Sequence, residues 1–469
     1  MQTRSRRSVV LTVAGAFFLL LLDSTILNTS LPQVASSMGV DTLALSPTIT
    51  GYLLASVAAM PLSAWLGQRF GTRRVYLFSI GVFVLASAAC GGSMTLWQLV
   101  AARIVQGAAG GLMLTVGRTL AIRDAQKGEL LSITSLLIWP ALLAPVVGPP
   151  LGGWITTVFS WRWNFLLNVP LGLLGMLLIA RFVPPDGKGG DAPMDWRGAS
   201  FAVGGLAVLF GGLELLARAP GRSGAALGTA LAVVASGAVL LALAVRHLLR
   251  VPGPVISLAP LRVRTFALAT FAAGTWASMS LHATPYLLPL MFQLVFGASA
   301  ATAGAMLLPY FLGNLLMKTA TTPVLRRFGF KPVLLVDGLL AMTLIALCGL
   351  LGKETPWVLM TGLLFAAGAA RSMLLTAQNT LCFADIDGPD RAAAATLSSI
   401  SMLLAQSLGI VGSTLMLAGA KASRGADSLE GADFGLAFVG IALVGIPGVL
   451  HFMRLAQDDG HEVTGAARR

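Results

Sequence analysis

The chain has 469 residues, of which 56% are hydrophobic and only 11% are charged, and its formal net charge is +13. Soluble globular proteins carry about 25% charged residues, so this composition excludes an ordinary soluble domain. Apolar runs of roughly 18 residues or more recur along the whole chain and predict an all-α polytopic membrane protein. The three cysteines and four histidines show no metal-ligand spacing, so we expect neither a metal site nor a disulfide framework.

The apolar pattern predicts fourteen transmembrane helices. The first leads into a polar stretch without a small-residue cleavage pattern, so we expect an uncleaved helix and not a signal peptide. An even number of spans places both termini on one side, and no loop is long enough for a folded soluble domain. The predicted spans cover approximately residues 8–35, 47–68, 74–93, 97–120, 132–158, 163–183, 196–217, 224–249, 265–290, 299–322, 332–351, 356–382, 392–419 and 432–454.

Basic residues between the predicted spans indicate the cytoplasmic side. They are more numerous at the termini and in the loops on the same side, which include Arg69, Arg73 and Arg74. The opposite loops carry few, among them Arg162 and Lys353. Both termini are therefore expected in the cytoplasm by the positive-inside rule. The basic excess is a signal of topology, and we expect no nucleic-acid partner.

The chain resembles itself at a nearly constant offset. "QRFGTRRVYLF" at 68 reappears as "RRFGFKPVLLV" at 326, and "LMLTVGRTL" at 112 as "MLLTAQNTL" at 373. We therefore predict a six-helix bundle over residues 1–190, two inserted helices over 191–260, and a second six-helix bundle with a short tail over 261–469. Two related halves that rock about a central cavity are typical of secondary transporters.

Asp23 lies behind six large apolar residues in "FFLLLLDSTILNTSLP". An ionised carboxylate near the centre of a membrane helix costs at least ~3 kcal/mol. Burial favours the neutral form, so Asp23 could alternate between a proton and a cationic substrate. The alternative is a carboxylate held in a fixed ion pair with an arginine across the cavity.

The fourth predicted span carries a polar and small-residue face. Arg103, Gln106, Gly107 and Gly110 share one side of the helix by their spacing, and we expect this side to face the bundle interior. The alternative is that Arg103 extends to the outer interface.

Two further motifs suggest packing between helices. Pro145, Gly148 and Gly152 share one face of the fifth span, where they would bend the helix and permit close contact; the alternative is an ordinary kinked helix. In the loop "AWLGQRFGTRR", Gly71 suits a tight turn beside basic residues. Recurrence of this loop in the second half favours a structural gate over a merely basic cytoplasmic loop.

Five stretches together resemble a known family: "LDSTILNTSLP", "AWLGQRFGTRR", "ARIVQGAAGG", "APVVGPPLGGW" and "WRWNFLLNVPLG". Their order and spacing resemble the fourteen-span drug:proton antiporters of the major facilitator superfamily, the EmrB/QacA type, over nearly the whole chain. The resemblance implies the major facilitator fold in a bacterial inner membrane. It also implies export of lipophilic compounds, cationic ones among them, in exchange for protons by alternating access.

The resemblance also implies roles for particular residues. Asp23 corresponds to a proposed protonation and substrate-charge site, and Arg103 to an arginine that assists proton transfer. Gln68 stands where the family usually has an acid, which puts the usual charge relay of that loop in doubt. The remaining motif positions are Asn28, Pro32, Arg69, Gly71, Arg73, Arg74, Gln106, Gly107, Pro145, Gly148, Pro149, Gly152 and Gly153.

Two charged or titratable residues of the second half are further candidates. The repeat places His282 at about the depth of Asp23, and we hypothesise that it faces Asp23 across the cavity; a histidine hydrogen-bonded between helices is the alternative. Arg371 corresponds to Gly110, so it should face inward, where it could attract an anionic group or pair with an acid. For Glu214, Lys318 and Asp337 we expect ordinary interfacial pairing or extension to the interface.

Other functions fit the sequence less well. An uptake symporter or an exporter of a metabolite, lipid or organic anion would share the fold. A membrane enzyme would need a nucleophile, metal site or carboxylate cluster, and a primary pump would need a G-x-x-x-x-G-K-[ST] loop, which is absent. We expect a monomer that uses the proton gradient without a cofactor, takes small lipophilic substrates, and shows no indication of a periplasmic adaptor.

Overall fold

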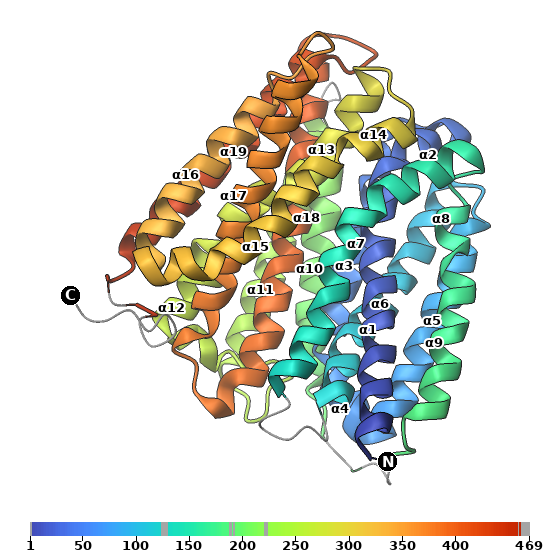
Figure 1. Cartoon of the computed structure of the whole chain (residues 1–469), viewed down its shortest axis with the longest axis vertical. Helices are drawn as coiled ribbons and strands as arrows, with labels where there is room; N and C mark the ends of the chain where they lie inside the picture. Colours follow the sequence, from blue (N-terminus) through green and yellow to red (C-terminus); the bar gives the residue numbers. More distant parts are fainter. Residues whose placement is uncertain are drawn as a thin grey trace.

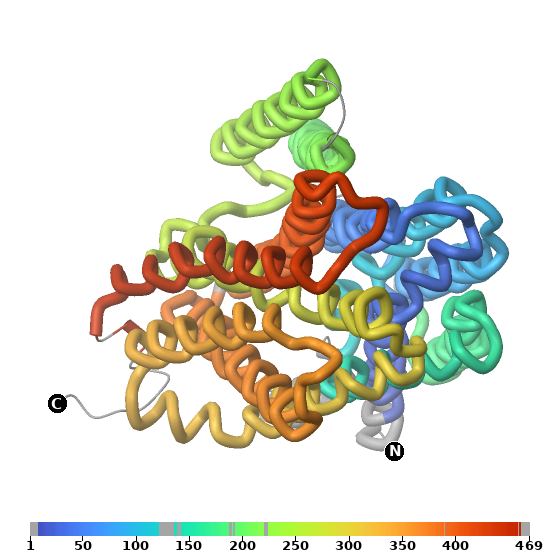
Figure 2. The backbone as a smooth tube through the Cα atoms, turned by 90° about the horizontal axis from the view of Figure 1, so that it is seen from above, coloured from blue at the N-terminus to red at the C-terminus, as the bar shows by residue number. Residues whose placement is uncertain are grey.

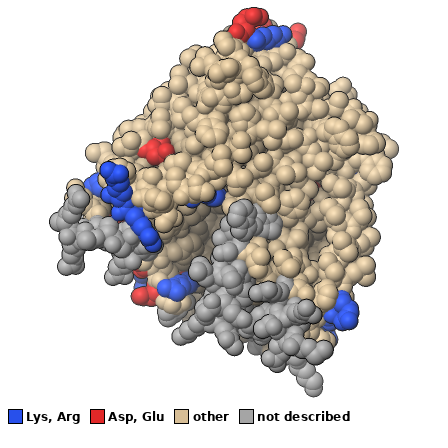
Figure 3. Space-filling view, viewed as in Figure 1, with Lys and Arg blue, Asp and Glu red and all other residues tan. Residues whose placement is uncertain are grey.

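The computed structural model describes residues 2–122, 130–186, 190, 193–219, 224–457 and 459–460. All regular elements within these residues are helices, and the described residues form no strand (Figure 1). Figure 3 shows charged side chains mainly near the two ends of the molecule, with a broad uncharged band between them. Such a band is expected of a surface that faces lipid.

The first part of the chain folds into long helices joined by shorter ones. Gly71, with φ of +93°, separates α4 from α5 in a conformation that side chains other than glycine rarely adopt, which confirms the tight turn expected there. The elements are α1 (Gln2–Ile26), η1 (Leu27–Thr29), α2 (Leu31–Met38), η2 (Thr42–Leu45), α3 (Ser46–Ala59), α4 (Leu62–Phe70), α5 (Thr72–Gly91), α6 (Leu96–Ile122), α7 (Leu130–Val158), α8 (Trp163–Leu166) and α9 (Asn168–Phe182).

The remaining elements are a hairpin and a second set of long helices. They are α10 (Trp196–Ala217), α11 (Gly224–Leu248), η3 (Ala259–Arg262), α12 (Arg264–Ala267), the π-turn η4 (Leu268–Ala272), α13 (Gly274–Leu294), α14 (Ala300–Met306), α15 (Leu308–Phe328), α16 (Phe330–Cys348), α17 (Trp357–Ala384), η5 (Gly388–Asp390), α18 (Arg391–Ser423), α19 (Gly431–His451) and η6 (Phe452–Arg454).

Twelve of the described helical stretches are long and apolar enough to cross a membrane, so the count of fourteen is not supported by length and composition. The fifth predicted span contains an apolar stretch, Leu142–Val158, that is shorter than the twelve candidate spans. The ninth predicted span is interrupted by η4, and α13 carries polar residues such as Ser280, His282 and Thr284. Most of α13 is buried inside the protein, and side chains that face the protein interior do not need to be apolar.

The same packing pattern occurs in both halves of the chain. In the first half α6 packs against α3 and α5, while α1 packs against α7 and α9. In the second half α17 packs against α15 and α16, while α13 packs against α18 and α19. The internal repeat of the sequence is therefore accompanied by a repeat in helix packing; the bundle limits at 190 and 260 stay predictions.

The hairpin of α10 and α11 lies at the side of the molecule. Its two helices pack on each other, and α10 also contacts α3 and α18. Figure 2 shows the hairpin projecting away from the two sets of long helices. Only 22% and 17% of the most apolar windows of these helices are buried, so most of their surface is available to lipid.

The two halves are joined by specific contacts at one end. Gln293 of α13 donates to the carbonyl oxygen of Thr29 at 3.0 Å, and Gln33 donates to Gln293 at 2.9 Å. Lys421 pairs with Asp41 at 2.9 Å. In Figure 1, α2 and α14 both lie at the end of the molecule away from the described parts of the termini, where α14 contacts η1. The structure therefore represents a conformation in which that end is held together.

Candidate functional site

The Asp23 carboxylate on α1 lies in a buried polar network. Its Oδ2 atom is 2.7 Å from Nη1 of Arg103 on α6. Its Oδ1 atom accepts hydrogen bonds from Gln106 Nε2 at 3.0 Å and from Asn168 Nδ2 at 2.6 Å. Asp23 and Arg103 are each only 1% exposed. Three donors therefore surround the buried Asp23 carboxylate, as burial of a charged pair requires.

Close packing of α3 on α6 positions the arginine. A Cβ atom at Gly107 would lie 2.1 Å from the carbonyl oxygen of Tyr52, so only glycine permits this approach. The Arg103 guanidinium then lies 4.1 Å from the centroid of the Tyr52 ring, and its Nε donates to the carbonyl oxygen of Thr48 at 3.2 Å. The ring face and the carbonyl both favour a cation here.

A second layer orients the donors. Gln106 Oε1 accepts from Arg103 Nη1 at 2.7 Å, while its Nε2 donates to Asp23. Asn168 Nδ2, on α9, donates to Ser87 Oγ at 2.9 Å as well as to Asp23. Asn168 is a site residue that sequence reasoning missed. The sequence contained a signal for Asn168, because an amide side chain within the apolar part of "WRWNFLLNVPLG" indicates a buried polar contact.

This geometry decides between two expectations for the first half. The expectation that Arg103 extends to the outer interface is wrong, because the side chain is buried against Asp23. The ion pair that we considered as an alternative for Asp23 is formed, within the first half of the molecule. His282 is not among the residues that hydrogen-bond to Asp23 in the described structure. No hydrogen bond therefore supports the hypothesis that His282 faces this carboxylate.

The second half contains a cationic group instead. Arg371 of α17 acts electrostatically on His282, Tyr310 and Lys318. Arg371 Nε and His282 Nε2 are buried without a hydrogen-bond partner among the described residues, and Lys318 Nζ donates to Thr376 Oγ1 at 3.3 Å. In the described part of the chain no acidic side chain forms an ion pair with Arg371 or Lys318.

The pairing expected for Asp337 is also not found. Its Oδ2 atom is buried without a hydrogen-bond partner in the part of the chain that the structure describes. Sequence alone could place Asp337 near the end of a span, but a partner requires another helix to present a base at the same depth. None of the neighbouring described helices does so.

The glycine motif of α7 joins the helix of Asp23 to the second half. Cβ atoms at Gly148 and Gly152 would lie 2.2 Å from Thr25 Oγ1 and 2.5 Å from the Ile26 carbonyl oxygen, both near the end of α1. A Cβ at Gly153 would lie 2.1 Å from the carbonyl oxygen of Ala300, at the start of α14. The motif therefore permits α7 to pack tightly on both sides, as small residues do between membrane helices.

Other motif residues lie near the contacts that α7 makes with α1 and with the second half. The Pro149 carbonyl oxygen accepts from Thr29 Oγ1 at 3.4 Å, and Asn28 Nδ2 donates to the Pro285 carbonyl oxygen at 3.5 Å. Pro32 lies in the first turn of α2, where its missing N–H is not needed. Pro145 is a half-buried residue inside α7.

Asp186 contacts the loop between α4 and α5, although it lies far from this loop in the sequence. Asp186, in the segment after α9, accepts hydrogen bonds at Oδ2 from the backbone N–H groups of Arg73 at 2.6 Å and Arg74 at 3.3 Å. A carboxylate at a helix N-terminus is favoured by the exposed N–H groups and the helix dipole. Asp186, which sequence reasoning did not single out, therefore brings an acid to the N-terminus of α5. Arg69 instead lies with its guanidinium 5.7 Å from the Trp65 ring centroid.

Comparison with known proteins identifies the family of this arrangement. The sequence profile of the Major Facilitator Superfamily matches residues 13–413. The chain is 31% identical over 461 residues to the "Probable transport protein HsrA" of Haemophilus influenzae, with 98% of each chain covered. It is 33% identical over 404 residues to the "Putative multidrug resistance protein MdtD" of Serratia proteamaculans, with 85% of this chain and 82% of that protein covered.

Solved structures show the same fold at low sequence identity. The nucleoside transporter NupG superposes with a TM-score of 0.61 at 12% identity, covering 95% of this chain and 98% of its own. The human organic anion transporter MFSD10 superposes with a TM-score of 0.59 at 16% identity, covering 95% and 99%. The profile match, the relatives and the fold together show that the chain is a multi-pass membrane transporter, not an enzyme, and that it belongs to the major facilitator superfamily.

Proposed function

We propose that this protein exports lipophilic compounds in exchange for protons. The observation that carries the proposal is the buried carboxylate of Asp23, held by Arg103, Gln106 and Asn168. An acid at this depth can exchange a proton only if its partners move, so its titration is tied to the conformation of three helices. The printed names of the MdtD relatives refer to multidrug resistance, which supports lipophilic drugs as the substrate class.

Protonation of Asp23 would change the network in a defined way. The three donors leave one lone pair of the carboxylate free, on Oδ2, and a proton there would neutralise Asp23. Neutralising Asp23 removes its charge attraction to Arg103, and with it an attraction between α1 and α6. Because α1 packs against the glycines of α7, and α7 in turn packs against α14, a shift of α1 reaches the contact between the two halves. Proton uptake and release would thereby bias which end of the molecule is closed.

The proposed topology has fourteen spans with both termini in the cytoplasm of a bacterial inner membrane. It adds α7 and the interrupted helix of α12, η4 and α13 to the twelve qualifying stretches. Supporting this, α7 has 29 residues, and α13 packs between α18 and α19 as α1 does between α7 and α9. The contacts between halves would then close the outer end and represent an inward-open state. We propose a monomer that uses the proton gradient without a cofactor, and a periplasmic adaptor is not indicated.

A second candidate is export of organic anions. Arg371 and Lys318 form no ion pair in the described structure, and an anionic group on the substrate would offset their charge. The two candidates share the fold and the coupling residue Asp23. They differ in which substrate charge Arg371 would attract or repel.

Transport in proteoliposomes tests both candidates. We would impose a pH gradient and measure movement of cationic, neutral and anionic lipophilic compounds by wild type, Asp23→Asn and Asp337→Asn. We expect Asp23→Asn to abolish gradient-driven transport, and Asp337→Asn, a half-buried acid of α16 in the second half, to retain it. Transport that ignores both the gradient and Asp23→Asn would refute proton coupling. Preference for anions that is lost in Arg371→Gln would favour the second candidate.

A further inference from the structure

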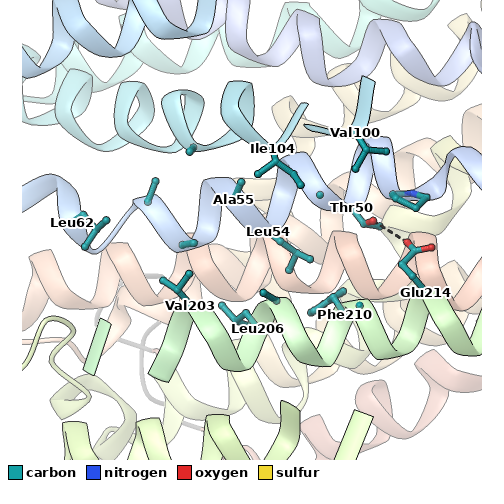
Figure 4. Close-up of a pocket in the computed structure, with 17 residues that line it drawn as sticks. Thr50, Leu54, Ala55, Leu62, Val100, Ile104, Val203, Leu206, Phe210 and Glu214 are labelled. Atoms are coloured by element: carbon teal, nitrogen blue, oxygen red, sulfur yellow. Dashed lines mark hydrogen bonds between the residues drawn. The ribbon is translucent and has the colours of Figure 1, made fainter. Parts of the chain in front are cut away.

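A cavity of about 460 Å³ lies outside the network of Asp23, between α3, α6 and the inserted helix α10 (Figure 4). Its walls are almost entirely apolar, with Leu54, Ile104, Leu206 and Phe210 among the larger side chains. Glu214 of α10 is the one ionisable side chain that lines it among the described residues. A cavity of this size can hold much of a drug-sized molecule.

The Glu214 carboxylate is held in place without a cation. Its Oε2 atom accepts from Ser46 Oγ at 2.7 Å, and its Oε1 atom accepts from Thr50 Oγ1 at 2.9 Å. Arg218, at the end of the same helix, is not among the hydrogen-bond partners of Glu214, and its guanidinium lies 5.6 Å from the Trp97 ring centroid. No described basic side chain forms an ion pair with Glu214.

Small residues keep the cavity open toward the lipid-facing side. A Cβ atom at Gly211 would have no atom within 4 Å, and Gly211 is exposed. Gly51, Ala55 and Ala207 also line the space. The helix that forms the outer wall, α10, belongs to the hairpin that projects from the molecule (Figure 2). A lipophilic molecule could therefore enter from the bilayer without passing between the two halves.

We propose that this cavity binds a lipophilic monocation, an amine or ammonium group on an apolar body. The apolar walls would take the body, and the cation would lie against Glu214. A carboxylate that is partly removed from water and forms no ion pair is costly, and a bound cation would offset that cost. The two hydroxyl groups that donate to Glu214 orient its carboxylate and leave lone pairs for a third donor.

The cavity adjoins the Asp23 network but is separate from it. Thr50, which donates to Glu214, lies two residues after Thr48, whose carbonyl oxygen accepts from Arg103. Both belong to the first turns of α3, so a bound cation would contact the helix that supports Arg103. The binding proposal itself does not depend on proton coupling, because binding can be measured without a gradient.

Equilibrium binding to the purified full-length protein in detergent tests the proposal. The probes would be a photoreactive lipophilic tertiary amine and its neutral, equally large analogue. We expect wild type to bind the amine roughly tenfold more tightly than the neutral analogue, about the effect of one charge-assisted hydrogen bond. Glu214→Gln should remove this difference, while Glu354→Gln, an exposed acid outside the cavity, should preserve it.

A second variant tests the cavity independently of the charge. Gly211→Leu should fill the space and weaken binding of both probes, and its open surroundings make folding defects unexpected. Photolabels should map to α3, α6 and α10. Retained preference for the amine in Glu214→Gln, unchanged binding in Gly211→Leu, or labels confined to residues around Asp23 would each overturn the proposal.

The same chemistry could come from a lipid headgroup. Competition by phosphatidylethanolamine but not by phosphatidylglycerol would support cation recognition with a lipid as its source. Lack of competition by either lipid, with amine binding intact, would support an amine from outside the bilayer lipids. Equal competition by both lipids would contradict recognition of a positive charge.

Discussion

Buried charges distinguish the two halves at the scale of single residues. Asp23 and Arg103 neutralise each other in the first half, whereas Arg371 and Lys318 have no acidic partner among the described residues of the second. A buried ion pair contributes little net stability, but removal of one partner leaves an uncompensated charge. The pair therefore serves to hold a titratable group in place more than to stabilise the fold.

A double-substitution cycle tests this coupling. Arg103→Met leaves the Asp23 carboxylate buried without a cation and should lower the free energy of unfolding by about 3 kcal/mol or more. Asp23→Asn combined with Arg103→Met should cost less than Arg103→Met alone, because no unpaired charge remains. Thermal unfolding in detergent would measure all three variants. Strictly additive losses would show that the two side chains are not coupled.

Helix contacts at the scale of elements depend on a few glycines. A Cβ at Gly153 or Gly304 would lie 2.1 Å from Ala300 O or 2.3 Å from Pro149 O, so α7 and α14 touch through their backbones. The sequence predicted that the α7 glycines permit close packing, and the contacts confirm it. The sequence could not predict that Gly153 faces the other half while Gly148 and Gly152 face α1. Small residues lie on more than one face of α7, and the sequence does not show which helix packs on each face.

Substitution at this contact should weaken the closed end. Gly153→Ala forces α7 and α14 apart, so a disulfide between Thr157→Cys and Ala301→Cys, whose Oγ1 and N atoms are 3.1 Å apart in the native protein, should form less efficiently. Gly175→Ala, at a helical glycine with no atom within 4 Å of its Cβ position, is the matched control and should leave the yield unchanged. Equal yields in both variants would mean that the contact is not limiting.

The start of α10 depends on a capping carboxylate outside the predicted span. Burial would raise the pKa of Asp195, but hydrogen bonds from the Gly198 N–H and from His247 outweigh this and lower it below its ordinary value. A lowered pKa in the folded state means that the ionised group stabilises the fold above its unfolded pKa of about 3.9 and that this contribution disappears as the pH falls.

Asp195→Ala should therefore destabilise the hairpin at neutral pH by about 1 kcal/mol. The difference from wild type should begin to shrink below about pH 4, where the unfolded carboxylate becomes protonated, and should disappear once the native carboxylate, whose pKa is lower, is protonated as well. Hydrogen exchange of the Gly198 amide at pH 7 and pH 3.5, corrected for intrinsic exchange rates, would measure it. A difference that is independent of pH would assign the effect to packing instead.

At the scale of the whole molecule, polar contacts hold the two halves together at one end, and some of these contacts are more deeply buried than others. Gln293 is buried and hydrogen-bonds to both Thr29 and Gln33 of the first half. The Lys421–Asp41 pair is more exposed, with Asp41 50% accessible. Buried hydrogen bonds contribute about 1 kcal/mol each, whereas exposed ion pairs contribute roughly 0–1 kcal/mol. Gln293 should therefore dominate closure of this end.

Gln293→Leu should shift the population toward separation of α2 and α14 by roughly tenfold or more, and Lys421→Ala should change it little. Spin labels on Ser36→Cys and Ala305→Cys, both exposed positions on these helices, would report the distance by electron resonance. The native cysteines Cys90, Cys348 and Cys382 are buried, which limits background labelling. A longer distance in Lys421→Ala but not in Gln293→Leu would reverse this ranking.

The sequence by itself determined the helical membrane architecture, the internal repeat and the placement of Asp23 and Arg103 within apolar spans, because hydropathy and the cost of a charge within an apolar run are local properties. Tertiary structure alone decided the partners. Asp23 hydrogen-bonds with Arg103 and Asn168 instead of His282, Glu214 accepts hydrogen bonds from Ser46 and Thr50, and Asp186 accepts from the Arg73 N–H at the start of α5. Each choice depends on helix rotation and depth, which are set by packing between segments far apart in the chain.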